Sequence, residues 1–543
     1  MMRRVAHCQV RRILRETRLR RSPVHHRRVT SFALLADRIV ETILDDDPAS
    51  CYIVGDHRLD DRLVDLSPEG VARETAMLRA AAGELRAAEP VEVDEQVDHA
   101  ILSATVEHWL FELTELRVHE WNPLLHNPGV LIAGLVERDS APAAERLGSL
   151  LGRLGQLPDA LAASRRMLHD CPEIHVRAAI AQFGGLRTLV ADGVARLLAE
   201  LPGRPVGNVP DAALAAIDEF VGWLEGLGPG RSPRLGRALW ERKMALSLDT
   251  DLPAADIVAT AWTAVERITD ELDELCGGDI PAAFAELAAD PVRHDQVLAH
   301  ARRITADARA FVAAHDLVTM VDDPVEIVLM PAHRAGVSTA KCHPPGPFDP
   351  AHIPTLIQLG VSSDPAASVD NTVAALQDML VHEAMPGHYL QLAHGRRHRG
   401  KVRALCASSA FREGWAVHAE RLMADAGFGG RGMKLAQLKT QLRVALNAIL
   451  DQLVHCADAA ENEVVALLTE RGFQSVREVR GKWRRAQLTS VNLSTYHVGY
   501  TEVAAIAAAR PAGTTVREWH DRMLAHGSPP ARHLRTLLGQ ADA

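Results

Sequence analysis

Residues 382–388 read His-Glu-Ala-Met-Pro-Gly-His, two histidines with a glutamate beside the first. The helical zinc motif HExxH places its histidines four residues apart, so that both imidazoles reach one ion while the glutamate serves as a base. Here His388 follows His382 by six residues. On an unbroken helix that spacing turns the two side chains roughly 240° apart. Shared binding of one ion therefore requires a change in the helix between them.

Pro386 and Gly387 supply such a change. Pro386 has no N–H to donate to the carbonyl of His382, and its ring crowds that carbonyl, so the helix must kink or bulge. Gly387 tolerates the unusual backbone angles that follow. We expect π-type bulges, which are frequent at functional sites, to absorb the two extra residues and restore the HExxH geometry.

A third candidate ligand, Glu413, lies 25 residues after His388 in the apolar, aromatic helical segment FREGWAVHAERLM (411–423). A buried carboxylate is costly unless it is paired or bound to a metal. Two histidines and a glutamate from a following helix form the ligand set of thermolysin-like zinc sites, which leave a fourth position for water. We therefore predict one zinc ion per chain, bound by His382, His388 and Glu413.

Other residues near this set have two interpretations each. Glu420, seven residues after Glu413, is either a hydrogen-bond partner for a ligand histidine or a surface acid. Asp378, one turn before His382, is a second candidate partner. His394 and His398 form another i,i+4 pair, but their stretch HGRRH is strongly basic and lacks a glutamate. For that pair we expect a solvated face.

The segments HEAMPGHYLQ and FREGWAVHAE together resemble the bacterial family called domain of unknown function 885, whose motifs read HEAxPGHxLQ and EGWAxYxE. That family is grouped with the HExxH metallopeptidases and resembles the thimet-oligopeptidase type of all-helical enzyme. Further blocks, LADRIVETILDDDPASCYIVGDHRLDDRLVDLSPEG and RLGQLPDALAASRRML, extend the resemblance to about residues 34–510. It implies a large all-α fold with a central cleft and little β structure.

The segment WRRAQLTSVNLSTYHVGYTEV (483–503) is similar to the family pattern RYxxxPxQAxxYxxG. The matching positions are Arg485, Tyr496 and Gly499. Four residues depart from the family patterns, where Tyr, Pro, Gln and a further Tyr are usual: Ala486, Ser490, Asn492 and His418. These departures leave the predicted ligands intact, but they bear on substrate preference and on the chemistry itself.

The residue types suggest roles in hydrolysis. Glu383 would take a proton from zinc-activated water as a general base and return it to the leaving amine as an acid. Tyr496 is the first candidate to stabilise the oxyanion, with His497 or Tyr500 behind it. Arg485 would hold a substrate carboxylate. In the alternative interpretation, Tyr496 is a core residue and Arg485 pairs with a helix acid.

The composition favours helices. Of 543 residues, 47% are hydrophobic and 24% charged, as in ordinary globular proteins. Tyr and Phe are scarce, at 4 and 10, and strong helix formers are abundant. The alternation typical of a strand is best at 323–331, and zinc hydrolases often lay substrate along an edge strand near the metal. Apolar residues recur at helical spacing in residues 31–47, 208–230, 255–276, 295–315, 433–471 and 500–510.

Two observations bear on location. No stretch reaches the roughly 18 apolar residues that a membrane span needs, so we expect no membrane partner. The seven cysteines are scattered without a CxxC pair, which favours a reducing compartment, and we predict a cytoplasmic protein.

The sequence indicates a weak boundary between two parts of the chain near residue 320. We predict a helical half over 31–320 and a second helical half over 321–543 that carries the metal site, with one shared core as an alternative. Residues 1–30 form a basic arm, predicted to be disordered. Its first 28 residues hold ten Arg and one acid, a formal charge of about +9. Nucleic acid is not expected as a partner, since a disordered tail or a start codon assigned too far upstream explains the arm equally well.

These patterns predict a zinc-dependent hydrolase that cleaves peptide or amide bonds. An alternative is a hydrolase for one small amide in a dedicated pathway, which would use the same residues. A helical di-iron protein would require two ExxH motifs on facing helices, and the sequence has no such pair. A scaffold without activity is disfavoured because the three ligands and Glu383 are all intact.

Overall fold

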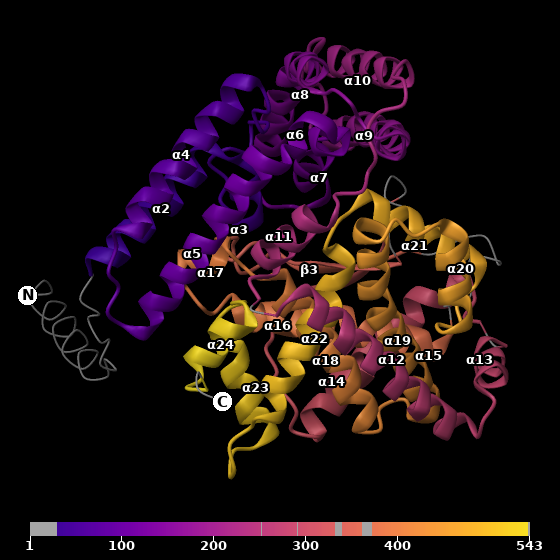
Figure 1. Ribbon diagram of the computed structural model, residues 1–543. Coiled ribbons are helices and arrows are strands. Elements are labelled where there is room, and N and C mark those ends of the chain that lie inside the picture. The colour runs from indigo at the N-terminus through magenta and orange to yellow at the C-terminus, as the bar shows by residue number, and fades with distance from the viewer. Residues whose placement is uncertain (1–29, 251, 290, 332–338, 361–371, 541–543) are drawn as a thin grey trace, which may run out of the picture.

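The computed structural model describes residues 30–250, 252–289, 291–331, 339–360 and 372–540, which are mostly helical and include one small sheet (Figure 1). This confirms the predicted all-α fold with little β structure. The predicted basic arm lies outside the described residues, apart from Thr30. Among the described helices, none combines the length and apolar character required to cross a membrane. The cysteines within the described residues are all free thiols.

The N-terminal part packs in two groups of helices. One group, α2, α4 and α5, surrounds a core that includes Val40, Ile101 and Leu102. The other, α7 to α10, surrounds Leu150 and Phe183, and lies at the top of Figure 1. The helices are α2 (Ser31–Asp46), α3 (Pro48–Val54), α4 (Pro68–Arg86), α5 (Val93–Phe111), α6 (Val118–Trp121), α7 (Gly129–Glu137), α8 (Ala143–Met167), α9 (Glu173–Glu200) and α10 (Val209–Glu225), with a π-helical turn η1 (Glu112–Leu116) and a 3₁₀ turn η2 (Pro123–His126).

The remaining helices form the body that carries the predicted site. Helices α12 and α19 pack along each other, as do α18 and α22. These helices are α11 (Arg237–Leu248), α12 (Ala254–Cys276), α13 (Ile280–Ala288), α14 (Val297–Ala314), α15 (Val373–Glu383), α16 (His388–Gly395), α17 (Lys401–Leu405), α18 (Ser409–Asp425), α19 (Gly430–Cys456), α20 (Glu461–Glu470), α21 (Val476–Leu488), α22 (Asn492–Ala508), α23 (Val516–Leu524) and α24 (Ala531–Leu537), with a 3₁₀ turn η3 (His294–Gln296).

The predicted helical segments are confirmed as α2, α10, α12, α14, α19 with α20, and α22. Residues 433–471 contain two helices and not one. Helix α19 ends at Cys456, and Asp458 adopts a left-handed conformation with φ of 50° that turns the chain before α20 begins. A helix cannot continue through such a residue.

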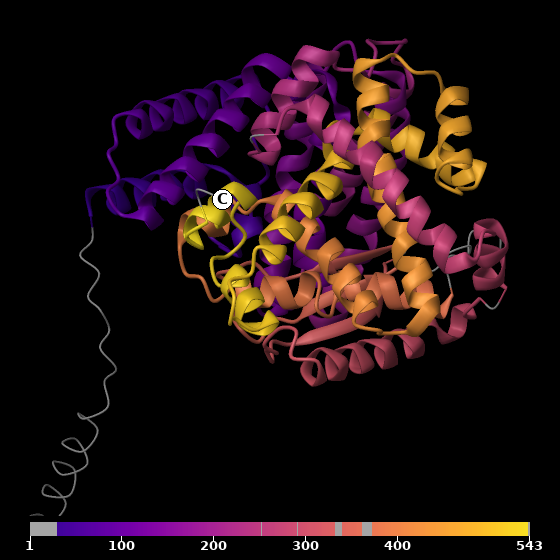
Figure 2. The ribbon, with the colours of Figure 1, turned by 60° about the horizontal axis from the view of Figure 1, so that its bottom comes forward.

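The apolar core does not divide at residue 320. Helices α12 and α13 share a core with α19 to α21, although they precede the predicted boundary by more than thirty residues. In the other direction, α17 packs against α2, α3 and α5, and α24 against α5. Figure 2 shows the yellow C-terminal helices beside the indigo N-terminal ones. Apolar contacts therefore join the two halves in both directions, and the division of the chain into domains stays a prediction.

Three short strands form one sheet with the order β1-β3-β2: β1 (Val325–Leu329), β2 (Ala340–His343) and β3 (Thr355–Leu359). β1 confirms the strand predicted at 323–331. It pairs with β3 in parallel, and β2 pairs with β3 antiparallel, with Cys342 opposite Ile357. The central strand β3 is fully buried. The edge strand near the predicted metal site is β2, which the sequence pattern did not reveal.

Side-chain caps fix where the helices of the site begin. Thr372 accepts a hydrogen bond from the N–H of Ala375 at the start of α15, and Ser408 accepts one from Phe411 at the start of α18. Ser475 and Glu478 form a capping box at the start of α21. Such caps satisfy backbone donors that a helix leaves unpaired.

Glycines bring α18 and α22 into close contact. A Cβ atom on Gly414 would lie 2.2 Å from the backbone of Gly499, and one on Gly499 would lie 1.9 Å from the carbonyl oxygen of Ala410. Any larger residue would therefore push the two helices apart. Glu413 lies beside the first glycine in sequence, and Tyr496 lies one turn before the second, so this contact sets their separation.

We predict that Gly499→Ala lowers the free energy of unfolding by about 1–3 kcal/mol, because the added methyl group meets backbone atoms. A matched control is Gly184→Ala in the exposed interior of α9, where a Cβ meets nothing within 4 Å. That change should stabilise by about 0.5–1 kcal/mol. Denaturant unfolding of both variants checks this, and equal stability of Gly499→Ala and the wild type would contradict the packing described.

Candidate metal centre

The two histidines of the motif lie on different helices. Helix α15 ends at Glu383, one residue after His382, and α16 begins at His388. The predicted π-type bulge is therefore wrong: the helix stops and restarts. The physical reason is that residues 384–387 leave helical geometry altogether, with Ala384 at φ −120° and ψ −85°.

Gly387 and Trp415 hold this break in place. The N–H of Gly387 donates to the carbonyl of Val381 at 3.0 Å, and a Cβ on Gly387 would lie 2.0 Å from the carbonyl oxygen of His382. The indole N–H of Trp415 donates to the carbonyl of Pro386 at 2.9 Å. The Pro-Gly pair thus reorients His388 toward His382, as the sequence analysis required, by a different backbone route.

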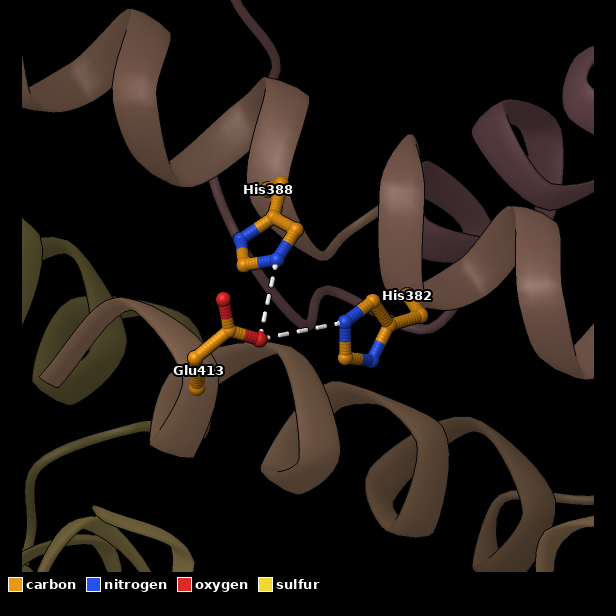
Figure 3. Close-up of side chains that lie close together, drawn as sticks. All are labelled: His382, His388 and Glu413. Carbon is orange, nitrogen blue, oxygen red and sulfur yellow. Dashed lines mark ion pairs between the residues drawn. The ribbon is translucent and has the colours of Figure 1, made fainter. Parts of the chain in front are cut away.

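His382, His388 and Glu413 converge on one point. Figure 3 shows both imidazoles directed at the same carboxylate oxygen of Glu413, which reaches them from α18. The Nε2 atoms of His382 and His388 lie 3.5 and 3.4 Å from Oε2 of Glu413. All three possible ligand atoms lie within 4.8 Å of one another. The structure therefore brings the three predicted ligands together.

These separations fit a shared zinc ion better than direct hydrogen bonds. A charge-assisted N–H···O bond measures about 2.7–2.9 Å. A tetrahedral zinc ion with bonds of about 2.0–2.2 Å separates neighbouring ligand atoms by roughly 3.3–3.6 Å. Oε2 of Glu413 is also buried and has no hydrogen-bond partner among the described residues. Two imidazoles and one carboxylate, with a buried oxygen left over, fit a metal.

Two of the three predicted ligands, His382 and Glu413, have shifted pKa values. Burial alone would raise the pKa of Glu413, but the two imidazoles outweigh it and hold that pKa well below its usual value. Burial would lower the pKa of His382, whereas Glu413 and Glu420 raise it well above its usual value. A cation at this point is therefore favoured by carboxylates on both sides of His382.

Glu420 is the partner of His382. Its Oε1 lies 2.5 Å from Nδ1 of His382, and its side chain is 1% exposed. Burial raises the pKa of Glu420, and the hydrogen bond to His382 opposes that rise. Asp378, the other candidate, instead accepts a hydrogen bond from Thr440 at 2.7 Å. Glu420 therefore directs Nε2 of His382 toward Glu413, as a partner of a ligand histidine does.

Glu383 faces a large cleft beside these ligands. The cleft has a volume of about 1620 Å³ and is bordered by α9, the loop 229–233, β2, α15, α18, α21 and α22. The backbone N–H of Cys342 in β2 donates to Oε2 of Glu383 at 2.6 Å. The edge strand therefore lies next to the predicted base. Sequence analysis missed Cys342, because a single cysteine in a four-residue strand carries no pattern.

Tyr496 and Arg485 also line this cleft. The two side chains are hydrogen-bonded to each other, and Arg485 also donates to Oδ1 of Asn492 at 3.0 Å. Burial raises the pKa of Tyr496, and the charge of Glu413 adds to this. Its hydroxyl group is therefore protonated at neutral pH and can donate a hydrogen bond into the cleft.

A buried carboxylate holds the start of α22 and so places Tyr496. Asp451 on α19 is 0% exposed and accepts hydrogen bonds from the backbone N–H groups of Val491 and Ser494, both at 3.2 Å. Val491 has a left-handed φ of 69°, which is costly for a β-branched residue. The indole N–H of Trp240 donates to the same carboxylate at 3.3 Å. Sequence analysis did not single out Asp451.

His497 and Tyr500 are not brought to the metal centre, which corrects their predicted place behind Tyr496. Nε2 of His497 lies 3.2 Å from the hydroxyl of Thr260 on α12, and burial lowers the pKa of His497 to about 4. Tyr500 is hydrogen-bonded to Gln441 on α19. Neither residue lines the cleft. Adjacent helical positions point roughly 100° apart, so Tyr496 and His497 cannot face the same site.

The four residues that depart from the family patterns lie outside the set of predicted ligands. His418 is paired with His520 at 3.4 Å between their Nε2 atoms, and burial lowers its pKa to about 3. Ala486 is buried in the core of α19 to α21, and Asn492 bonds to Arg485. Nothing in the structure explains Ser490. None of these residues touches the three ligands.

The second histidine pair, His394 and His398, forms hydrogen bonds with backbone groups. Nε2 of His394 lies 2.7 Å from the carbonyl oxygen of Thr319, so this imidazole ties α16 to the segment before β1. Nδ1 of His398 accepts a hydrogen bond from the N–H of Gly400. The two rings have separate partners.

Comparison with known proteins identifies the family of this chain. The family described as a bacterial protein of unknown function, DUF885, matches residues 48–538. The chain belongs to this family. The match confirms the resemblance stated from the motifs, and it extends beyond residue 510 to include α23 and α24.

Two solved structures are similar to this chain. A predicted lipoprotein of unknown function from Shewanella oneidensis has a TM-score of 0.79 at 25% identity, over 94% of this chain and 100% of the other. A predicted lipoprotein from Colwellia psychrerythraea has a TM-score of 0.77 at 15% identity, over 95% and 100%. No curated protein matches the sequence. Both solved structures therefore share the fold of this chain over nearly all of its length.

We predict that Glu420→Gln weakens zinc affinity about 10- to 100-fold, because His382 loses the carboxylate that orients and polarises it. Asp378→Asn, which alters the carboxylate bonded to Thr440, should leave the affinity close to wild type. Competition with a chromophoric chelator measures both. Equal losses in the two variants would assign the effect to general electrostatics of the buried acids and contradict the specific role of Glu420.

Proposed function

We propose that this DUF885 protein is a zinc-dependent hydrolase that cleaves peptide bonds. The observation that carries the proposal is the convergence of His382, His388 and Glu413 at the edge of a large cleft, with Glu383 beside them. Their donor set of two imidazoles and one carboxylate is that of catalytic zinc sites, which keep a position open for water.

The chain's own residues have distinct tasks in this mechanism. When bound by the three ligands, zinc supplies an acidified water molecule and polarises the scissile carbonyl. Glu383 takes the proton of the attacking water and later delivers it to the leaving amine. For this purpose it lies in the cleft and is held by the N–H of Cys342. Glu420 keeps His382 in the orientation that binding requires.

Tyr496 is the proposed oxyanion donor. Its protonated hydroxyl lines the cleft, and its hydrogen bond to Arg485 fixes the direction of the phenol. A donor already in place where negative charge develops stabilises the transition state more than the ground state. Arg485 is therefore proposed as a positioning residue for Tyr496 as well as a contact for substrate.

The size of the cleft favours peptides over a single small amide. Pockets for small molecules measure about 300–1,000 Å³, and this cleft exceeds that range at about 1620 Å³. β2 borders it with one edge next to Glu383, where an extended chain can add as a further strand. The likeness to thimet-type oligopeptidases, which the family resemblance implies, is part of this proposal. Cytoplasmic location stays a prediction, supported by the free cysteines.

We predict about one zinc ion per wild-type chain, with a large loss in Glu413→Ala and a retained ion in Glu383→Gln. Hydrolysis of a mixed peptide library should disappear in the first variant and fall about 10²- to 10⁴-fold in the second, because a general base contributes that much. Elemental analysis and the peptide assay on the same samples check both. Two irons per chain, or full activity in Glu383→Gln, would sink the proposal.

We predict that Tyr496→Phe lowers kcat about 10²- to 10³-fold with little change in KM, as expected when one oxyanion donor is removed. His497→Gln is the matched control, since His497 contacts Thr260 outside the cleft, and its kcat should stay close to wild type. Steady-state kinetics on one cleaved peptide decide. A rise in KM with unchanged kcat for Tyr496→Phe would assign Tyr496 to substrate binding instead.

A further inference from the structure

The cleft beside the metal centre carries more cationic than anionic side chains, although the whole chain has a formal net charge of −10. Its carboxylates belong to Glu173, Glu383, Glu413 and Glu461. Its cationic side chains are Arg177, Arg231, Lys341, Arg412, Arg480, Arg484 and Arg485. The positive charge is therefore a local property of this surface and runs against the charge of the molecule.

The carboxylates of the cleft are already engaged. Glu173 forms an ion pair with Arg177 at 2.9 Å, and Glu461 forms one with Arg480 at 3.3 Å. The other two carboxylates belong to the metal centre and its base. None of the four is directed to a further arginine of the cleft within the part of the chain that the structure describes.

Four guanidinium groups thus have no carboxylate partner among the described residues: Arg231, Arg412, Arg484 and Arg485. Arg231 lies over the ring of Trp121, 5.1 Å from its centroid. Arg485 bonds to Asn492 and Tyr496, which are uncharged. These four arginines line the cleft, where substrate would lie.

These arginines come from separate walls of the cleft. Arg231 lies in the loop before α11, Arg412 lies on α18 directly before Glu413, and Arg484 lies on α21. One terminal carboxylate would reach only one of these walls. A chain with several negative charges along its length would reach them all.

We infer that the cleft selects acidic peptides, in which aspartate or glutamate side chains flank the bond that is cut. This inference rests on the proposed function and names its substrate class. Arg231, Arg412 and Arg484 contact the acidic side chains, while Arg485 also positions Tyr496. Because these arginines are exposed or only partly buried, each contact contributes modestly, about 1.5- to 5-fold in affinity. Several acting together give about tenfold.

The test compares two internally quenched peptides of the same sequence, one with glutamate and one with glutamine on both sides of the scissile bond. At 50 mM NaCl, kcat/KM for the glutamate peptide should exceed that for its glutamine counterpart about tenfold. At 500 mM NaCl the ratio should shrink toward one, because salt screens exposed charges. The double variant Arg231→Gln, Arg484→Gln should lose most of the preference already at low salt.

Arg79→Gln is the matched control. Arg79 is an exposed arginine on α4 that does not line the cleft, and its loss should change neither the ratio nor the rates. A second measurement separates substrate class from catalysis: fluorescence anisotropy of both labelled peptides with full-length Glu383→Gln protein. That protein should bind the glutamate peptide about tenfold more tightly, as several exposed ion pairs predict.

The outcomes distinguish the two claims. Preferred binding of the glutamate peptide without cleavage by the wild type would support the acidic ligand and overturn the proposed hydrolysis. Equal cleavage of both peptides would overturn the inference and leave the hydrolase intact. Tighter binding of a single-stranded oligonucleotide than of the glutamate peptide would also overturn it, because the cleft would then serve a different polyanion.

Discussion

The site depends on the position of His382 between two carboxylates, Glu413 and the fully buried Glu420. Burying one carboxylate without a partner costs several kcal/mol, and here two converge on one imidazole, at 3.5 and 2.5 Å. They hold opposite sides of the ring, so its orientation is fixed. Both come from α18, seven residues apart, and the packing of α18 against α15 therefore decides whether a metal can bind.

The surrounding helices are arranged to keep that packing in register. Gly387 allows the chain to stop α15 and restart it as α16 within four residues, which turns His388 toward the same carboxylate. Gly414 and Gly499 let α22 approach α18 until backbone touches backbone, and Asp451 secures the first turn of α22. The phenol of Tyr496 is thus placed by interactions that lie outside the cleft.

The cleft exists because both halves of the chain build it. Its walls include α9 from the N-terminal part and α21 from the C-terminal part, and these two helices contact each other. Shared apolar cores join the halves in both directions. Since the unpaired arginines come from both halves, the charge of the cleft, like its shape, is a property of the assembled fold.

The sequence by itself determined the helical class, the DUF885 family, and His382, His388, Glu383 and Glu413 as one chemical set, because ligand types and helical periodicity are local signals. It also indicated that Pro-Gly must reorient one histidine. Only the tertiary structure decided between Glu420 and Asp378, removed His497 and Tyr500 from the site, and placed β2 beside Glu383. Those outcomes depend on which helix faces which, and that is set by glycine contacts and buried caps between residues far apart in the chain.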